Sequence, residues 1–243
     1  VCLEKLGDAQ VTAGDLAAAR QSFQNSHQIY TRLATANPGS AEAQRDVSVS
    51  LNKLGNVQAS AGDLAAARKS FEDSHQILTR LATANPSSVQ AQRDVVDGLN
   101  ALGNEQMTAG ELAAAHKSFD DSVQIARRLA AANPGSAQAQ RDLAVSLNKL
   151  GDVQMATGDP AAARKSFADS HQTLTHLASA NPSSAEAQRD VAASLWRLAQ
   201  LPGGGVRWRE VADVLNTMEA RGLLAPTDAR LAAEARRRAA EEK

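Results

Sequence analysis

The chain has 243 residues, with 26 lysines and arginines against 27 aspartates and glutamates, and a formal net charge of −1. This balance argues against non-specific binding to nucleic acid, which needs a basic surface. The single cysteine, Cys2, excludes a disulfide framework and fits a reducing compartment, so we expect a cytoplasmic protein. No run of about 18 apolar residues is present, so we expect no segment to bind or span a membrane.

The composition favours helices. Fifty residues are alanine and only seven are aromatic, namely four Phe, two Trp and one Tyr. Alanine punctuated by leucine, with few runs of β-branched residues, is typical of helices that pack at close range. We therefore expect an all-α chain.

A 48-residue repeat runs through most of the chain. Asn-Pro recurs at 37–38, 85–86, 133–134 and 181–182, and glycine followed by an acid recurs at 14–15, 62–63, 110–111 and 158–159. Residues 47–94 and 143–190 are identical at 35 of 48 positions. We divide the chain into repeats 1–46, 47–94, 95–142, 143–190 and a partial repeat 191–201, followed by a C-terminal segment 202–243. Repeats of this length are typical of solenoids.

Each repeat predicts two helices. In the second repeat, Ser40 can cap the first helix, which ends at Gly62, and Asp63 can cap the second helix. The second helix is expected to end at Asn85, because the following proline disfavours a helical residue before it. In the fourth repeat, Pro160 directly follows the capping acid, and proline is favoured at the first position of a helix.

Such helix pairs cannot bury both of their faces alone, so they are expected to stack on their neighbours in an array. One phenylalanine in each repeat is predicted to fill the space between the two helices. One glycine in the middle of each first helix is predicted to admit a neighbouring group, because glycine there costs about 1 kcal/mol relative to alanine. These residues are Phe23, Phe71, Phe119 and Phe167, and Gly7, Gly55, Gly103 and Gly151.

This pattern resembles the tetratricopeptide repeat (TPR) family. The second repeat has the family's spacing in Leu51, Leu54-Gly55, Gly62-Asp63, Ala67 and Phe71. The repeat departs from the family in its length, 48 instead of about 34 residues, and in glutamine at the position usually held by tyrosine. It is similar to the longer repeats of kinesin light chains and of bacterial signalling and effector arrays. The resemblance implies a right-handed superhelical α-solenoid of antiparallel helix pairs.

The resemblance also implies that the first helix of each repeat lines a concave groove. The predicted groove residues are Asn52 and Asn56, Asn100 and Asn104, Asn148 and Asp152, with Lys53 and Lys149 one residue further round the helix. Asparagine offers two donors and an acceptor, so this series could bind the backbone of an extended peptide. The lysines could bind acidic side chains or a terminal carboxylate. The alternative is that these residues are only solvated polar side chains.

No catalytic, metal or cofactor site is expected, and we do not expect an enzyme. His27, His75 and His171 share one repeat position, but equivalent residues of stacked helices lie about 8–10 Å apart, too far for bonds of about 2 Å to one metal ion. We interpret them as surface histidines. Cys2 has no base beside it in the sequence, and the glycines at 203–205 lack the lysine of a phosphate loop.

Two further features are interpreted as structural. An Arg-Asp pair recurs at 45–46, 93–94, 141–142 and 189–190, and we expect it to form ion pairs between adjacent repeats and not a recognition stripe. The C-terminal segment predicts helices over 206–220 and from Thr227 or Asp228 towards Ala240. We expect these helices to cap the array, with Trp196 and Trp208 as anchors.

The sequence therefore predicts a protein–protein interaction scaffold that binds a peptide or protein segment in its groove. The alternative is a self-associating arm of a larger signalling or effector protein, a homo-oligomer formed through the terminal repeats. The chain begins at Val1 and not at Met, so we expect a fragment or a processed product. Sedimentation of a chain extended by one repeat separates the two hypotheses.

Overall fold

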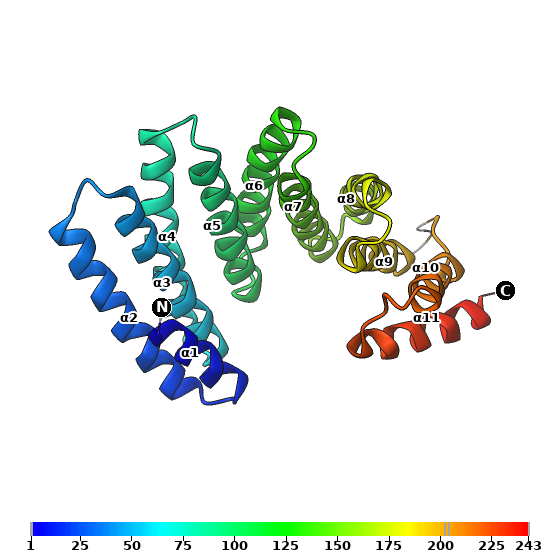
Figure 1. The fold of residues 1–243 in the computed structure, drawn as a ribbon, viewed down its shortest axis with the longest axis horizontal. Helices are drawn as coiled ribbons and strands as arrows, with labels where there is room; N and C mark the ends of the chain where they lie inside the picture. The colour runs from blue at the N-terminus through cyan, green and yellow to red at the C-terminus, as the bar shows by residue number, and fades with distance from the viewer. Residues whose placement is uncertain (1, 202, 204, 243) are drawn as a thin grey trace. The chain divides into compact units, whose positions relative to one another are not determined.

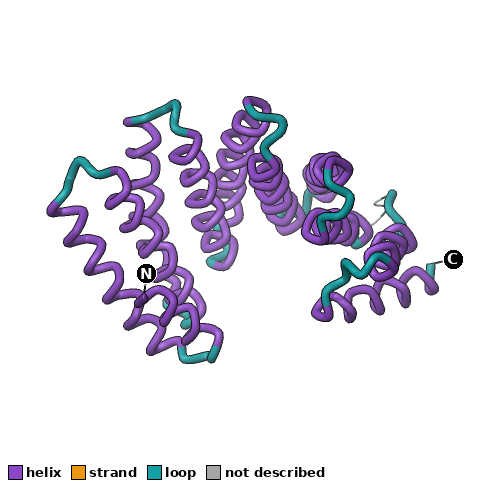
Figure 2. The backbone as a smooth tube through the Cα atoms, in the orientation of Figure 1, coloured by secondary structure: helices purple, strands orange, loops and turns teal. Residues whose placement is uncertain are grey.

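The computed structural model describes residues 2–201, 203 and 205–242, and every regular element among them is helical (Figure 2). The first helices of the repeats are α1 (Cys2–Thr12), α3 (Ala41–Ser60), α5 (Val89–Thr108), α7 (Ala137–Ala156) and α9 (Ala185–Ala199). The second helices are α2 (Leu16–Ala36), α4 (Leu64–Ala84), α6 (Leu112–Ala132) and α8 (Pro160–Ala180). The C-terminal segment holds α10 (Trp208–Ala220), the 3-10 turn η1 (Pro226–Asp228) and α11 (Ala229–Glu241).

The predicted helix boundaries within the repeats are confirmed. The Ser40 hydroxyl accepts a hydrogen bond from the Ala43 N–H at 3.1 Å, and the Asp63 carboxylate accepts one from the Ala66 N–H at 3.3 Å. Gly62 between the two helices has φ of +81°, a left-handed conformation that other residues rarely adopt. The recurring Gly-acid pair thus ends one helix and begins the next.

The chain forms two compact units, residues 1–125 and 126–243, which divide within α6. In the N-terminal unit, α1 to α5 follow one another as antiparallel neighbours, and α5 also contacts α3 (Figure 1). In the C-terminal unit, α7, α8, α9, α10 and α11 pack in chain order. The first helices α1, α3 and α7 therefore pack on α2, α4 and α8, the second helices of their own repeats. None of the described helices is long and apolar enough to cross a lipid bilayer.

The interior of each repeat is built around its phenylalanine, as predicted. A Cβ atom on Gly7 would lie 2.5 Å from a ring carbon of Phe23. A Cβ atom on Gly55 would lie 2.9 Å from the ring of Phe71. Because real Cβ atoms do not approach this closely, the glycines are needed for the two helices to pack around the ring. The interpretation of the mid-helix glycines as packing positions is confirmed.

The glutamine that replaces the usual tyrosine also joins the two helices of a repeat. In each repeat, a serine hydroxyl of the second helix pairs with the glutamine side chain of the first helix. The pairs are Ser22 with Gln10 at 2.7 Å, and Ser70 with Gln58, Ser118 with Gln106 and Ser166 with Gln154, each at 2.8 Å. A polar pair of this kind is satisfied internally, so it costs little to bury.

The C-terminal helices are attached to α9 through aromatic residues. The rings of Trp196 and Trp208 meet edge to face, with centroids 4.8 Å apart and an interplanar angle of 84°. The Arg238 guanidinium lies 4.5 Å from the centroid of the Trp208 ring. The helix predicted from Val206 begins at Trp208, whose backbone N–H donates a hydrogen bond to Glu242 at the far end of α11.

Candidate functional site

Successive first helices are joined by the predicted arginine–aspartate pairs. Arg45 of α3 donates two hydrogen bonds to Asp94 of α5, from Nε at 2.6 Å and from Nη2 at 2.9 Å. This hydrogen-bonded carboxylate raises the pKa of Arg45. Arg141 of α7 pairs in the same way with Asp190 of α9, at 3.2 Å. The structural interpretation of the Arg-Asp series is confirmed at these junctions.

The same arginine position joins α9 to the C-terminal segment. Arg189 Nε donates to Asp228 Oδ2 at 2.7 Å, and Asp228 is only 9% exposed. We expected Thr227 or Asp228 to cap the last helix, and this expectation is wrong, because no side chain makes a capping hydrogen bond at the start of α11. The Asp228 carboxylate instead accepts the hydrogen bond from Arg189.

A hollow of about 180 Å³ lies on the first-helix face of the N-terminal unit. We call it the Asn52 hollow. It is lined by Arg45, Ser48, Val49, Asn52, Lys53 and Asn56 of α3, with Leu78 of α4 and Asp94 and Asp97 of α5. Its lining is polar and charged apart from Val49 and Leu78.

Three of the predicted groove residues meet at this hollow, namely Asn52, Lys53 and Asn56. The Asn52 Oδ1 atom is buried and has no hydrogen-bond partner among the described residues. Lys53 is already engaged, because its Nζ atom lies 2.7 Å from Oδ1 of Asp8 in the preceding first helix. Lys53 therefore holds α1 to α3, and its ammonium group would have to leave Asp8 to bind an acidic ligand.

The other two predicted residues of the N-terminal unit differ in exposure. Asn100 is 9% exposed, and its Oδ1 accepts a hydrogen bond from the Ser122 hydroxyl at 3.0 Å. Asn104 is exposed on α5. Asn100 is thus partly committed to contacts inside the protein, whereas Asn104 is accessible to a ligand.

In the C-terminal unit, Asn148 and Lys149 are half-buried, and Asn148 Oδ1 lacks a partner among the described residues. Asp152 forms an ion pair with Arg197 of α9. Burial raises the pKa of Asp152, and the Arg197 guanidinium opposes this shift. The positions of Asp152 and Arg197 correspond to those of Asp8 and Lys53, so this ion pair is also a recurring link between first helices.

The three histidines at this repeat position are only partly exposed, so their interpretation as surface residues is wrong. His27, His75 and His171 are half-buried between helices, and burial lowers the pKa of each imidazole. His27 Nδ1 lies 3.0 Å from the Ser50 hydroxyl, and His171 Nδ1 lies 2.8 Å from the Ser194 hydroxyl. They link a second helix to the next first helix. Within the described part of the chain, no group of three or more His, Cys, Asp or Glu residues could hold a metal ion.

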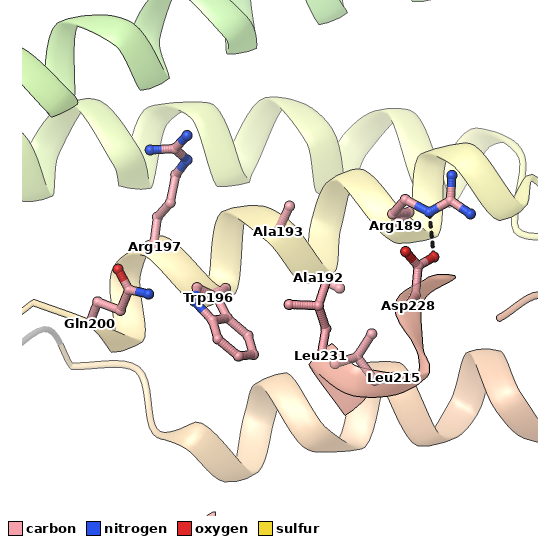
Figure 3. Close-up of a pocket in the computed structure, with 9 residues that line it drawn as sticks. All are labelled: Arg189, Ala192, Ala193, Trp196, Arg197, Gln200, Leu215, Asp228 and Leu231. Carbon is pink, nitrogen blue, oxygen red and sulfur yellow. Dashed lines mark hydrogen bonds and ion pairs between the residues drawn. The ribbon is translucent and has the colours of Figure 1, made fainter. Parts of the chain in front are cut away.

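A second hollow, of about 440 Å³, lies on α9 in the C-terminal unit. We call it the Trp196 pocket. It is lined by Arg189, Ala192, Ala193, Trp196, Arg197 and Gln200 of α9, with Leu215 of α10, Asp228 of η1 and Leu231 of α11. Figure 3 shows the Arg189–Asp228 pair at one end, Arg197 and Gln200 at the other, and Trp196 between them.

The six α9 residues of this pocket occupy the same repeat positions as the six α3 residues of the Asn52 hollow, 144 residues earlier. Trp196 takes the place of Asn52, and Ala192 takes the place of Ser48. Leu231, which is 49% exposed, adds further apolar surface from α11. Sequence reasoning treated Trp196 only as an anchor. Trp196 occupies the repeat position of Asn52, Asn100 and Asn148. This position could have indicated that Trp196 also lines the first-helix face.

No protein-family model and no curated protein matches the sequence. The structure is similar to that of a putative kinesin light chain with nearly identical TPR-like repeats from Podosopora anserina, with a TM-score of 0.61 and 14% identity over 90% of this chain and 95% of that one. It is also similar to BtubC (BKLC) from P. vanneervenii, with a TM-score of 0.55 and 15% identity over 93% and 90% of the two chains. The fold is that of the TPR-like repeat proteins.

A third similar structure is a signal transduction ATPase with numerous domains that carries a tetratricopeptide repeat sensor, from Pyrococcus horikoshii. Its TM-score is 0.54 with 11% identity, and the match covers 90% of this chain but 29% of that one. The resemblance that the sequence suggested is therefore confirmed for the fold, and the TPR-like repeats here are of the long type.

Proposed function

We propose that the chain is a protein-interaction module that binds an extended segment of another protein along the face formed by its first helices. One observation carries this proposal. The Asn52 hollow and the Trp196 pocket are built from the same six repeat positions, although they lie in different compact units. Each unit thus offers a hollow on its own first helices, and solenoid proteins commonly use that face to bind partners.

The two hollows suit different features of a protein segment. Asn52 and Asn56 supply amide donors and acceptors that can pair with a peptide backbone whatever its side chains. The Trp196 pocket has an apolar floor with arginines at both ends, and its volume lies in the range that accommodates a large side chain. The polar hollow would fix the path of the backbone, and the apolar pocket would supply most of the buried area.

Peptides selected from a displayed random library against the full chain test this proposal. For a selected peptide, Asn52→Ala with Asn56→Ala is expected to weaken binding about tenfold, the effect of losing one or two hydrogen bonds at an interface. The matched control is Gln76→Ala with Gln124→Ala, which changes the same number of amides at one repeat position on second helices. The proposal fails if the two double variants bind alike.

A second candidate function, self-association, is favoured by an apolar face on α1 and α2. Leu6, Ile29 and Leu33 are 47–50% exposed, whereas Leu54, the counterpart of Leu6 in the next repeat, is 8% exposed. If this face joins two copies, Leu6→Glu with Leu33→Glu converts dimers into monomers in sedimentation equilibrium. Val89→Glu, which places an acid on an exposed apolar site at the start of α5, is the control and should leave the oligomeric state unchanged. Wild-type chain that sediments as a monomer at all concentrations excludes this candidate.

A further inference from the structure

The junction between α1 and α3 contains a cation, an aromatic ring and an acid in mutual contact. Lys53 Nζ lies 5.6 Å from the centroid of the Phe23 ring and 2.7 Å from Asp8 Oδ1. These three residues line a hollow of about 350 Å³ together with Val57. A cation over an aromatic face gains from the negative charge of the ring as well as from the carboxylate.

The junction between α7 and α9 repeats this arrangement at equivalent positions. The Arg197 guanidinium lies 5.7 Å from the centroid of the Phe167 ring and forms an ion pair with Asp152. Both cations come from the later first helix, and both acids come from the earlier one. The chain therefore fills the same place with its own basic side chain at two junctions in different compact units.

The junction between α3 and α5 keeps the ring but lacks the cation. Phe71 is present, whereas Ala101 stands at the position of Lys53, and Asn56 stands at the position of Asp8. Ala101 packs against the cluster that contains Phe71. No lysine or arginine among the described residues lies over the Phe71 ring. The place that Lys53 and Arg197 occupy at the other two junctions thus holds only the short side chain of Ala101 here.

The same junction carries an acid at a position that is apolar elsewhere. Glu105 stands where the second, fourth and fifth repeats have the buried residues Val57, Val153 and Leu201, and where the first repeat has Ala9. Glu105 is 4% exposed, and its Oε2 atom is buried without a hydrogen-bond partner in the part of the chain that the structure describes. Val57, its counterpart, lines the hollow beside Phe23 and Lys53, so the repeat places Glu105 beside Phe71.

The charges around Glu105 do not balance. Arg68 is the basic group whose charge favours ionised Glu105, but Arg68 already forms ion pairs with both Glu72 and Glu111. The Arg68 guanidinium is thus shared among three carboxylates. Burial raises the pKa of Glu105, and the charges of Glu111 and Glu72 add to this shift. A buried carboxylate without a partner is destabilising, so this region favours the arrival of a further cation.

We propose that the α3–α5 junction binds a lysine or arginine side chain of the segment on the first-helix face, with its cation beside the Phe71 ring and paired with Glu105. The guest side chain takes the place that Lys53 and Arg197 hold at the other junctions. This inference rests on the proposed function and adds a side-chain preference to it. A free carboxylate in a low-dielectric site gains more from an ion pair than an exposed one does, which gives the preference its strength.

Two substitutions copied from the chain's own repeats test the proposal. Ala101→Lys restores the internal cation of the second repeat, and Glu105→Val restores the valine found at 57 and 153. Because both residues occur at the same position in neighbouring repeats, both variants are expected to fold, and circular dichroism checks this. Glu42→Gln, which removes an exposed acid from the first turn of α3, is the charge-matched control.

Peptides are selected against the full wild-type chain, and affinities are measured with a selected peptide and with its analogue carrying norleucine in place of lysine. On wild type and Glu42→Gln, the norleucine analogue is expected to bind about tenfold more weakly, as for a charge-assisted contact over an aromatic ring. On Ala101→Lys and Glu105→Val, the difference is expected to fall below about twofold. An undiminished difference on both variants, or selected peptides without an enriched basic residue, overturns the inference while peptide binding itself stands.

If the wild-type chain selects no peptide, the proposed function fails, and a small probe tests the cation site alone. N-acetyl-lysine methylamide is titrated into the labelled full chain and followed by NMR. Shifts of the amides at 101–105 that are lost in Glu105→Val support the site. A titration that leaves these amides unchanged overturns it.

Discussion

The α3–α5 junction and the junction between α9 and the C-terminal segment share one contact and differ in almost everything around it. In each junction, an arginine of the earlier helix forms an ion pair with a nearly buried aspartate. The pairs are Arg45 with Asp94 and Arg189 with Asp228. The hollow beside the pair measures about 180 Å³ and is polar in the first case, and about 440 Å³ and largely apolar in the second. The ion pair is thus the constant part of the junction, and the lining is the variable part that can determine what is bound.

The largest difference between the two junctions is expected from Trp196→Ala. Trp196 packs on Trp208 and lies under Arg238, so its loss should destabilise α9 and α10 by about 3 kcal/mol. Asn52→Ala at the equivalent position should cost under about 1 kcal/mol. Because repeat arrays unfold in parts, native-state hydrogen exchange is the proper measurement, with the α9 and α10 amides reporting on Trp196→Ala and the α3 amides on Asn52→Ala. Equal effects of the two substitutions would mean that Trp196 does not hold the C-terminal helices.

Glu105→Val should stabilise the α3–α5 junction by about 2 kcal/mol at pH 7, because it removes a buried carboxylate whose Oε2 atom has no hydrogen-bond partner among the described residues. Burial raises the pKa of Glu105, so the folded state binds its proton more readily than the unfolded state does. Ionised Glu105 therefore lowers the free energy of unfolding by its full amount only at pH values well above the pKa of Glu105 in the folded state. This loss of stability disappears as the pH falls towards the unfolded-state pKa of about 4.5. Urea denaturation of both chains from pH 8 to 5 should show the advantage of the variant shrinking. An advantage that is constant with pH contradicts this reading.

The shared ion pair predicts similar losses from Asp94→Ala and Asp228→Ala. Each substitution leaves a half-exposed arginine without its carboxylate and should cost about 1–2 kcal/mol. Hydrogen exchange of α5 and of α11 reports the two losses separately. The exposed pair Lys117–Asp121 offers a comparison, since Asp121→Ala should cost under about 0.5 kcal/mol. A loss of stability in only one of the two variants would mean that the two junctions are not equivalent.

The smallest effect concerns the histidine links. His75 Nδ1 is buried without a partner among the described residues, because Gly98 stands where Ser50 and Ser194 serve His27 and His171. Gly98→Ser should stabilise by about 1 kcal/mol, from the hydrogen bond and from the loss of a helical glycine. Its Cβ would lie 3.0 Å from a terminal methyl of Leu78, which must move slightly. Thermal unfolding with Gly98→Ala as the control separates the two contributions.

Acidification should destabilise the wild-type chain through the half-buried His75. Burial lowers the pKa of His75, so the folded state binds this proton less readily than the unfolded state does. The contribution of neutral His75 to the free energy of unfolding is therefore fully present above the unfolded-state pKa of about 6.5. This contribution is lost as the pH falls below that value. Replacing His75 by the valine of the third repeat, His75→Val, should reduce the loss between pH 7 and 5, as measured by urea denaturation. An unchanged pH profile would contradict this assignment.

The sequence predicted those parts of the fold that follow local rules and recur in every repeat. Gly62-Asp63 identified the turn, Pro160 identified a helix start, and the Phe71 and Gly55 positions identified the packing of the two helices. Each of these depends on residues close in the sequence or on one contact within a repeat. Periodicity then excluded alternatives, because the same local signals return after every 48 residues.

The sequence did not predict contacts that depend on how one helix meets the next. The histidines were assigned to the surface because their serine partners are 23 residues away on the following helix. Asp228 was assigned to a cap because the C-terminal segment has no repeat to show that Arg189 would reach it. Glu105 was visible as a change from valine at one repeat position, and comparing the repeats position by position would have found it.

The most direct test of the central claim is an NMR map of the full chain with a selected peptide bound. The account predicts that amide shifts concentrate on the first helices, around 45–56 of α3 and 189–200 of α9, and leave α4 and α8 largely unchanged. Shifts that concentrate on the second helices, with the Asn52 hollow and the Trp196 pocket unaffected, would contradict it.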